Sequence, residues 1–295
     1  MSETRVVTAD RLTAEQADRV EEIAGSAQAA DGVAPLGEQF LLRLRGDGDG
    51  VTHLLGHRGD EVAGYAQLDP HDPAGAAGEL VVAADARRHG VGRALVAAAE
   101  RTDPRLRVWA HGGLPAAAAF AERLGFAPVR SLWQMRLALA DVPDLPEPVA
   151  PDGLTVRLFR PGADERAWLE VNARAFASHP EQGRVQLADL EARERADWFD
   201  PEGFFLAERD DRLVGFHWTK VEDGVGEVYV IGVDPGEQGT GLGKVLLLTG
   251  LAHLRDRGLD TVTLYVESDN TAAVGLYRKL GFVHGGTDTM YARRA

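Results

Sequence analysis

One short pattern occurs twice in this chain, at corresponding places in its two halves. Arg87-x-x-Gly90-x-Gly92 in the first half matches Gln238-x-x-Gly241-x-Gly243 in the second, at an offset of 151 residues (87 to 238). Each occurrence follows a valine-rich stretch typical of a buried strand and precedes an apolar stretch with helical spacing. A strand–loop–helix unit that recurs in this way predicts two copies of one domain.

A second pair of landmarks supports the same repeat. Leu124-Gly125-Phe126 matches Leu280-Gly281-Phe282 at an offset of 156 residues (124 to 280). The order of helical and strand patterns also agrees between the halves, which predicts an α/β fold with a mixed sheet in two tandem domains. Helices are expected over residues 12–30 (capped by Thr13), 93–101, 115–124, 163–177, 184–199, 242–257 and 271–280; strands are expected over 51–57, 62–68, 79–82, 106–110, 127–139, 154–159, 204–208, 213–221, 228–233, 261–266 and 283–291.

A proline-rich segment separates the two copies. Pro143, Pro146, Pro148 and Pro151 lie within twelve residues, 141–152, and such a run cannot form a helix or an interior strand. We therefore expect an N-terminal domain over 1–140, a linker over 141–152 and a C-terminal domain over 153–295.

Composition excludes several classes of function. The chain has no cysteine, which rules out disulfides, thiolate nucleophiles and cysteine-ligated metals, and we predict no metal site. A net charge of −14 argues against a nucleic-acid partner, and no apolar run reaches the ~20 residues of a membrane span. The expected protein is cytoplasmic and monomeric, with no membrane or nucleic-acid partner.

The glycine-rich loops predict an anion site, because the first N–H groups of the following helix have no partner within the helix. A Walker loop is excluded, since Gln238 stands where its first glycine belongs and Val245 follows Lys244. A dinucleotide fingerprint is excluded by Leu95 and Leu246 at the position of its third glycine. A plain chain-reversing turn remains the alternative, and the presence of two matching copies argues against it.

The [Gln/Arg]-x-x-Gly-x-Gly loop and the Leu-Gly-Phe after the late helix resemble those of the GCN5-related N-acetyltransferase (GNAT) family, in both halves of the chain. The resemblance implies acetyl-CoA as acetyl donor, with its pyrophosphate on the loop and its pantetheine arm along the preceding strand, possible in each domain. The implied cofactor-binding residues are Ile231, Gly232, Val233, Gln238, Gly239, Thr240, Gly241, Leu242, Gly243, Lys244, Asn270, Thr271, Ala272, Ala273, Val274 and Gly275, and in the first copy Leu80, Val81, Val82, Arg88, His89, Gly90, Val91, Gly92 and Arg93.

Two residues of the second copy are candidates for proton transfer. Glu227 at the start of its strand could accept the proton of an amine, and Tyr277 on the late helix could protonate a thiolate leaving group. A solvated strand-end carboxylate and a core-edge aromatic are the alternative interpretations. The repeat offsets place Ala76 and Ala121 at these positions in the first copy. Glu79 is one residue out of phase with Glu227, so we expect it to point to the other face of the sheet. We therefore expect the first domain to bind acetyl-CoA without catalysing transfer.

The substrate is predicted by resemblance alone. The strings DGVAPLGEQ, HPEQG, GFHWTKV and LYVESDN are similar to those of tandem GNAT proteins that acetylate the cysteinyl amine of a cysteinyl-glucosaminyl-inositol, a small amine thiol. Two other functions stay open: acetylation of another small amine or a protein N-terminus, and non-catalytic sensing of acetyl-CoA. The residues implied to contact the acceptor are Glu38, Glu181, Lys220, Glu227 and Tyr265.

Overall fold

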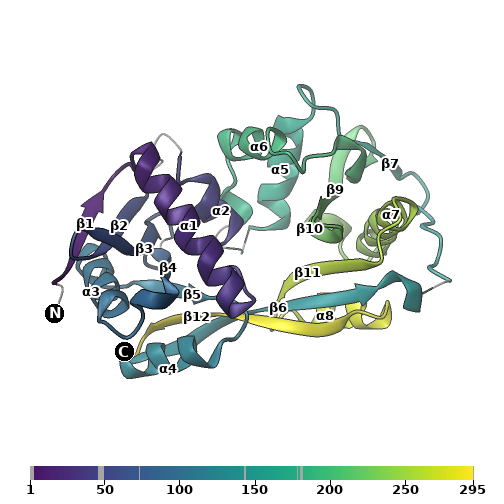
Figure 1. The fold of residues 1–295 in the computed structure, drawn as a ribbon. Helices are drawn as coiled ribbons and strands as arrows, with labels where there is room; N and C mark the ends of the chain where they lie inside the picture. Colours follow the sequence, from purple (N-terminus) through teal and green to yellow (C-terminus); the bar gives the residue numbers. More distant parts are fainter. Residues whose placement is uncertain are drawn as a thin grey trace. The chain divides into compact units, whose positions relative to one another are not determined.

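The computed structural model describes residues 3–45, 50–72, 74–142, 144–177, 179 and 182–294 (Figure 1). The chain forms two compact units, one of Met1–Leu132 with Gly286–Ala295 and the other of Trp133–Gly285. Two tandem α/β domains were predicted, and this architecture is confirmed. The units nevertheless divide at different residues from the expected ranges 1–140 and 153–295, because the last residues of the chain belong to the first unit.

The first unit is a sheet in the order β1-β2-β3-β4-β5-β12 with helices packed on it. Helix α1 packs on β3 and β4, whereas α3 packs on β1 to β4. Strands β4 and β5 are parallel, whereas the pairs β1–β2, β2–β3, β3–β4 and β5–β12 are antiparallel. The elements are β1 (Thr4–Ala9), α1 (Ala14–Asp31), α2 (Glu38–Leu42), β2 (Thr52–Arg58), β3 (Glu61–Asp69), β4 (Ala77–Val82), α3 (Val91–Thr102), β5 (Arg107–Ala110), α4 (Pro115–Arg123), the start of β6 (Phe126–Ala138) and the end of β12 (Val283–Arg293).

The second unit repeats this plan with the strand order β6-β11-β10-β9-β8-β7. Strands β10 and β11 are its parallel pair, and α7 packs on β8, β9 and β10. The elements are the end of β6, β7 (Thr155–Leu158), α5 (Glu165–Ala175), α6 (Leu187–Glu194), β8 (Phe204–Arg209), β9 (Arg212–Glu222), β10 (Val225–Val233), α7 (Leu242–Asp256), β11 (Thr261–Glu267), α8 (Thr271–Lys279) and the start of β12.

The packing of helix on sheet follows the repeat to the level of single residues. A Cβ on Gly64 would lie 2.9 Å from Val91 and 3.2 Å from Leu95, so α3 approaches β3 where the strand has no side chain. At the 151-residue offset, a Cβ on Gly215 would lie 3.0 Å from Leu246, one turn into α7. The same glycine contact therefore sets the distance between helix and sheet in both units.

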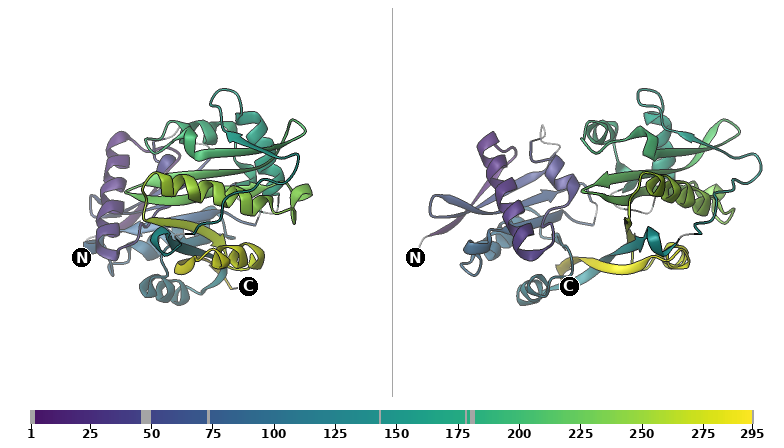
Figure 2. Two further views of the ribbon diagram at one scale, coloured as in Figure 1. Left: turned by 90° about the vertical axis from the view of Figure 1, so that its right-hand side faces the viewer. Right: turned by 45° about the vertical axis from the view of Figure 1, so that its right-hand side comes forward.

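The strands that complete the two sheets differ from the prediction. Residues 127–139 were expected to close the first copy and 283–291 the second. In the structure, Thr289–Ala292 of β12 pair with Arg107–Ala110 of β5 in the first unit. In the second unit, the start of β12 lies beside the end of β6, where His284 packs edge-on against Trp133 (Figure 2). Each unit thus includes residues that the repeat pattern assigned to the other copy.

Predictions from local sequence patterns were more accurate than the prediction of which strand completes each sheet. The predicted cap Thr13 forms a capping box with Gln16, and helix α1 begins as expected. The helix expected over 184–199 is shorter, since α6 covers only Leu187–Glu194. Strand β1 was not predicted; it pairs with β2 along the edge of the first sheet.

Apolar burial in each unit centres on the helix–sheet interfaces. Leu54, Leu55, Tyr65 and Leu95 are fully buried in the first unit, and Trp168, Trp218, Leu246 and Phe282 in the second. Among the described residues, none of the helices is both long and apolar enough to span a membrane.

Candidate acetyl-CoA and amine sites

The glycine loop of the second unit has an open, left-handed backbone. Gly239 and Gly241 have φ values of 81° and 90°, and a Cβ on either would meet no atom within 4 Å. Gly241 is the N-cap of α7, and its carbonyl accepts from the amides of Lys244 and Val245. The preceding amides of the first turn have no partner within the helix, so their partial positive charge is available to an anion. The loop fits a pyrophosphate.

The first unit reproduces this loop. Arg88 and Gly90 have φ values of 67° and 92°, matching Gly239 and Gly241 at the 151-residue offset. The conformation is retained although Arg88 is not a glycine, and left-handed backbone costs such a residue free energy. We infer that the shape of the loop is maintained in both copies.

Arg87 lines the cavity of the first unit, and its guanidinium is held by partners within the protein. Its guanidinium donates to both carboxylate oxygens of Asp31, at 2.8 and 2.7 Å, and to the carbonyl of Val82. The ion pair lowers the pKa of Asp31. Arg87 therefore ties the end of α1 to the end of β4 and positions the loop.

The two parallel strands next to each loop are paired over only a few residues and then separate. In the first unit the register pairs are Ala77 with Arg107 and Gly78 with Val108; in the second they end at Val228 with Leu264. The predicted cofactor residues of the strands, 80–82 and 231–233, lie beyond these pairs. Their backbone edge is thus placed to pair with an extended ligand arm.

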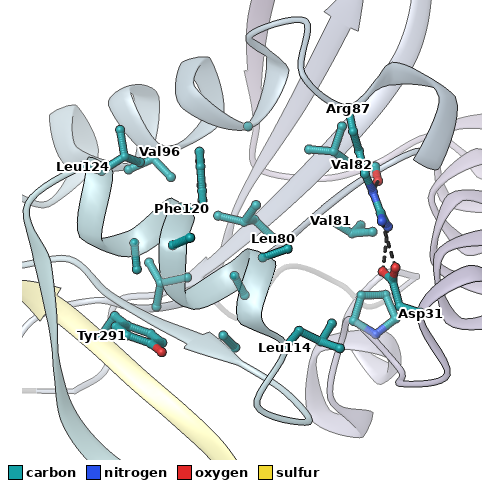
Figure 3. A pocket seen from close by; sticks show the side chains of 18 of the residues that line it. Asp31, Leu80, Val81, Val82, Arg87, Val96, Leu114, Phe120, Leu124 and Tyr291 are labelled. Carbon is teal, nitrogen blue, oxygen red and sulfur yellow. Dashed lines mark hydrogen bonds and ion pairs between the residues drawn. The ribbon is translucent and has the colours of Figure 1, made fainter.

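A cavity of about 800 Å³ occupies this place in the first unit (Figure 3). Side chains of β4, α3, β5 and α4 line it. Two predicted residues are not among the lining residues: Val91 is buried beside Gly56 and Gly64, and the His89 ring bonds to the carbonyl of Arg87. The predicted residues that line it are Leu80, Val81, Val82, Arg88, Gly90, Gly92 and Arg93.

Predicted cofactor residues of the second unit also begin helix α8. Asn270 is its N-cap, and its side chain accepts from the amide of Ala273 at 3.1 Å. Val274 faces the core and is buried. The remaining residues, 271–273 and 275, form the first turns of the helix.

Glu227 and Lys220 are cross-strand partners on β10 and β9. Antiparallel partners project to the same face of a sheet, so the carboxylate and the ammonium are neighbours. Lys220 is buried, lies 4.7 Å from the Trp198 ring centroid and 5.8 Å from that of Tyr229, and pairs with Glu222 at 3.0 Å. This aromatic enclosure of Lys220 was not predicted from the sequence.

Tyr277 projects from α8 into the second core. It is 6% exposed, and its ring lies 5.7 Å from that of Phe282. Burial raises the pKa of Tyr277 to about 12. At neutral pH the phenol carries its proton, as it also would at the ordinary pKa of a tyrosine, 10.0.

The expected orientation of Glu79 is wrong, and a β-bulge explains why. The register of β10 with β9 skips Tyr229, so Glu227 pairs with Lys220 and Val230 with Trp218. In the first unit, without such a skip, Glu79 pairs with Gln67 and Ala77 with Asp69. The extra residue moves the counterpart of Glu227 from Ala76 to Ala77 and places Glu79 on the same face. The counterpart is still an alanine.

Glu79 is instead part of a buried charge network in the first unit. His111, at the end of β5, lies 3.0 Å from Glu79 and 2.9 Å from Asp288 through its two ring nitrogens. Glu79 also accepts from the amide of Gly37, and Asp288 from that of Gly112. Burial lowers the pKa of His111, but the two carboxylates outweigh that effect and raise it to about 10. Because each carboxylate is so engaged, Glu79 is poorly placed to act as a base.

We expect His111→Ala to destabilise the first unit by about 3 kcal/mol, since it leaves two carboxylates without their cation. The folded pKa exceeds that of an unfolded histidine, 6.5, so this stabilisation is complete below that pH and is lost as pH rises through about 10. Hydrogen exchange of β4 and β5 peptides between pH 6 and 10 measures it, after correction for intrinsic exchange rates.

The exposed pair His71–Asp69 provides the control, because His71→Ala removes a histidine–carboxylate contact that is more open to solvent. Its cost should stay below about 1 kcal/mol. An equal loss in both variants, or a pH-independent loss for His111→Ala, would contradict the buried-network interpretation.

The other predicted acceptor residues belong to different units. Tyr265 on β11 is exposed, and its hydroxyl accepts from Gln134 at 3.1 Å. Glu38 is the first residue of α2 in the first unit. Glu181 lies outside the described residues.

Known proteins match this chain over nearly all of its length. The acetyltransferase (GNAT) family matches residues 164–282, and an acetyltransferase (GNAT) domain matches residues 49–128. A mycothiol acetyltransferase of Thermomonospora curvata is 56% identical to this chain, and the match covers 99% of this chain and 98% of the relative. A mycothiol acetyltransferase of Catenulispora acidiphila is 52% identical, and the match covers 92% of this chain and 93% of the relative. Among solved structures, a GCN5-related N-acetyltransferase from Sphaerobacter thermophilus has a TM-score of 0.69 at 26% identity, covering 98% of this chain and 95% of its own. A tandem GNAT protein of the clavulanic acid pathway has a TM-score of 0.73 at 19% identity, covering 98% of both chains, and shares the fold.

Proposed function

This chain belongs to the acetyltransferase (GNAT) family, and from that premise we propose that it transfers acetyl from acetyl-CoA to the cysteinyl amine of 1D-myo-inositol 2-(L-cysteinylamino)-2-deoxy-α-D-glucopyranoside, which gives mycothiol. The relatives named mycothiol acetyltransferase, matched nearly end to end, support this acceptor. The observation that carries the enzymatic assignment is that the second unit combines an open glycine loop with Glu227 and a protonated, buried Tyr277.

Acetyl-CoA supplies an activated thioester as acetyl donor. The residues proposed to hold it in the second unit are those of the loop, Gln238 to Lys244, with 231–233 beside the pantetheine arm and 270–275 at the start of α8. Backbone N–H groups at the start of α7 would bind the pyrophosphate, which the loop conformation favours.

Glu227 is proposed as the proton acceptor for the attacking amine. The nitrogen forms a bond to the thioester carbonyl carbon while it loses a proton, directly or through one water, to the carboxylate. Tyr277 is proposed as the acid: the C–S bond breaks, and the phenol supplies the proton that the leaving thiolate takes up. The phenol of Tyr277 carries its proton at neutral pH, as a tyrosine of ordinary pKa also does, and is therefore in the form that can donate.

Lys220, Glu227 and Tyr265 of the second unit are proposed to contact the acceptor. The roles of Glu38 and Glu181 remain predictions from the family resemblance. A buried ammonium beside a carboxylate suits a hydroxyl-rich amine, since both can hydrogen-bond to hydroxyl groups. We place the protein in the cytoplasm as a monomer that acts on a small molecule and not on nucleic acid.

The first unit is proposed to bind a CoA thioester without catalysing transfer. Its loop and cavity support binding. Ala77 and Ala121 occupy the positions of Glu227 and Tyr277, so it has neither proton-transfer group at these places.

Mass spectrometry of the products tests the reaction. We expect the cysteinyl pseudo-disaccharide incubated with acetyl-CoA to gain one acetyl group on nitrogen. Modification of only another small amine or a protein N-terminus would favour a different acceptor, and acetyl-CoA binding without any transfer would favour a sensor.

Gly92→Asp tests the first site. A carboxylate at the start of α3 repels a pyrophosphate, so we expect at least tenfold weaker binding of acetyl-CoA there. Isothermal titration should show two sites in the unaltered chain and one in the variant. Gly243→Asp is the matched change in the second loop; if it alone removed all binding, the first site would not hold the thioester.

A further inference from the structure

The cavity of the first unit extends beyond the phosphate loop into an apolar region. Arg88 and Arg93 line it at the loop. Away from the loop most of its lining residues are aliphatic or aromatic, although Asp31, His111 and Arg123 also line it. Val96, Phe120, Leu124 and Tyr291 surround the same space in Figure 3. A ligand anchored by phosphate at the loop would thus meet an apolar surface farther in.

In the second unit, two positions of this lining carry larger side chains. At the 156-residue offset, Ala110 of β5 corresponds to Val266, and Ala121 of α4 corresponds to Tyr277. Both alanines line the cavity, whereas Val266 and Tyr277 are each 6% exposed within the second core. Two large side chains of one copy are therefore replaced by methyl groups at the cavity wall of the other.

The residues around these alanines still leave a cavity between them. Phe126, the counterpart of Phe282, still lines the cavity, as do Val108 and Leu124. A protein interior normally fills its space with side chains, so a large apolar cavity that persists beside an anion-binding loop is suited to a ligand with an apolar part. Acetyl, with one methyl group, offers little apolar surface to bury.

We propose that the first unit binds the CoA thioester of an aliphatic acyl group longer than acetyl, with the acyl chain in the space that Val266 and Tyr277 occupy in the second unit. This inference rests on the proposed binding of a CoA thioester by the first unit and adds the class of acyl group. Each buried methylene tightens binding by about fourfold at best. Hexanoyl-CoA should accordingly bind the first unit at least tenfold more tightly than acetyl-CoA.

The test uses the full chain with its second loop disabled by Gly241→Asp and Lys244→Glu, so that binding reports the first site. Titration with acetyl-CoA, butyryl-CoA and hexanoyl-CoA should give affinities that rise with chain length. Ala121→Tyr restores the side chain of the second copy and should abolish that rise. Ala118→Tyr is the matched control, because Ala118 is exposed on the same helix and is not among the lining residues.

The outcomes separate this inference from the function on which it rests. If no thioester binds the disabled chain while its thermal unfolding is unchanged, neither the first CoA site nor the acyl preference stands. If acetyl-CoA binds as tightly as hexanoyl-CoA, the CoA site stands and the acyl preference is overturned. A rise with chain length that survives Ala121→Tyr would overturn the assigned location of the chain.

Discussion

We expect Glu227→Gln to lower kcat by about 10²–10⁴-fold, the usual contribution of a general base. Glutamine has nearly the same size and keeps a polar group beside Lys220, so the face of β10 and β9 should pack as before. It cannot accept the amine proton at neutral pH. Steady-state kinetics with the cysteinyl acceptor should show the loss in kcat, with little change in the KM for acetyl-CoA.

Tyr277→Phe should lower kcat at least tenfold for a different reason. The phenol is the proposed proton donor to the leaving thiolate, and phenylalanine keeps the packing against Phe282 while removing the hydroxyl. An acetyl thioester of a more acidic thiol needs less help from an acid. Such a donor should therefore reduce the defect of Tyr277→Phe and leave that of Glu227→Gln unchanged.

Glu222→Gln is the control for charge near Lys220. Glu222 is exposed and pairs with Lys220 from the same strand, so the variant alters the neighbourhood without removing the proposed base. Its turnover should stay within about threefold of that of the unaltered chain, because the exposure of Glu222 to solvent weakens its pair with Lys220. Near-normal rates for both Glu227→Gln and Tyr277→Phe would refute the assignment of acid and base.

Local sequence patterns predicted the parts of the site that depend on neighbouring residues. The capping box at Thr13 and the glycine loops are set by short-range hydrogen bonds and by backbone conformations that few residues adopt. The matching φ values of Gly90 and Gly241 confirm that two similar strings of residues form the same loop. The offset of the repeat could therefore be used to compare the copies at this level.

The face of the sheet on which Glu79 lies could not be predicted from the same offset. A β-bulge inserts one residue at Tyr229, and nothing in the apolar pattern around it distinguishes a regular strand from a bulged one. Every residue before the bulge changes face relative to the first copy. The comparison of Glu227 with Ala76 was thus off by one residue, although Ala77 leaves the chemical conclusion unchanged.

The network of His111 depends on a contact between residues far apart in the chain. Asp288 follows the first half by more than a hundred residues, and the repeat pattern assigned its strand to the second copy. Exchange of the last strand changes few local interactions, because either copy offers it a similar edge. Only the tertiary structure shows which edge is used.

Ending the chain after Gly285 should unfold or strongly destabilise the first unit, whose other residues all precede 133. The truncation removes the partners of β5 at Thr289–Ala292, the fully buried Met290 and the Asp288 carboxylate that holds His111. A buried methionine alone is worth about 2–5 kcal/mol, which is comparable to a large part of the stability of a domain.

Ending the chain after Ala292 is the matched truncation, because it retains the β5 pairing and removes only the last three residues, Arg293 to Ala295, with the pair of Arg293 and Glu100. Hydrogen exchange resolved by peptide should show β3, β4 and β5 unprotected after the longer truncation and protected after the shorter one. Met290→Ala should lie between the two. If the longer truncation instead exposed only the second unit, the last strand would belong to the copy that precedes it in sequence, and the first unit would fold without residues 286–295.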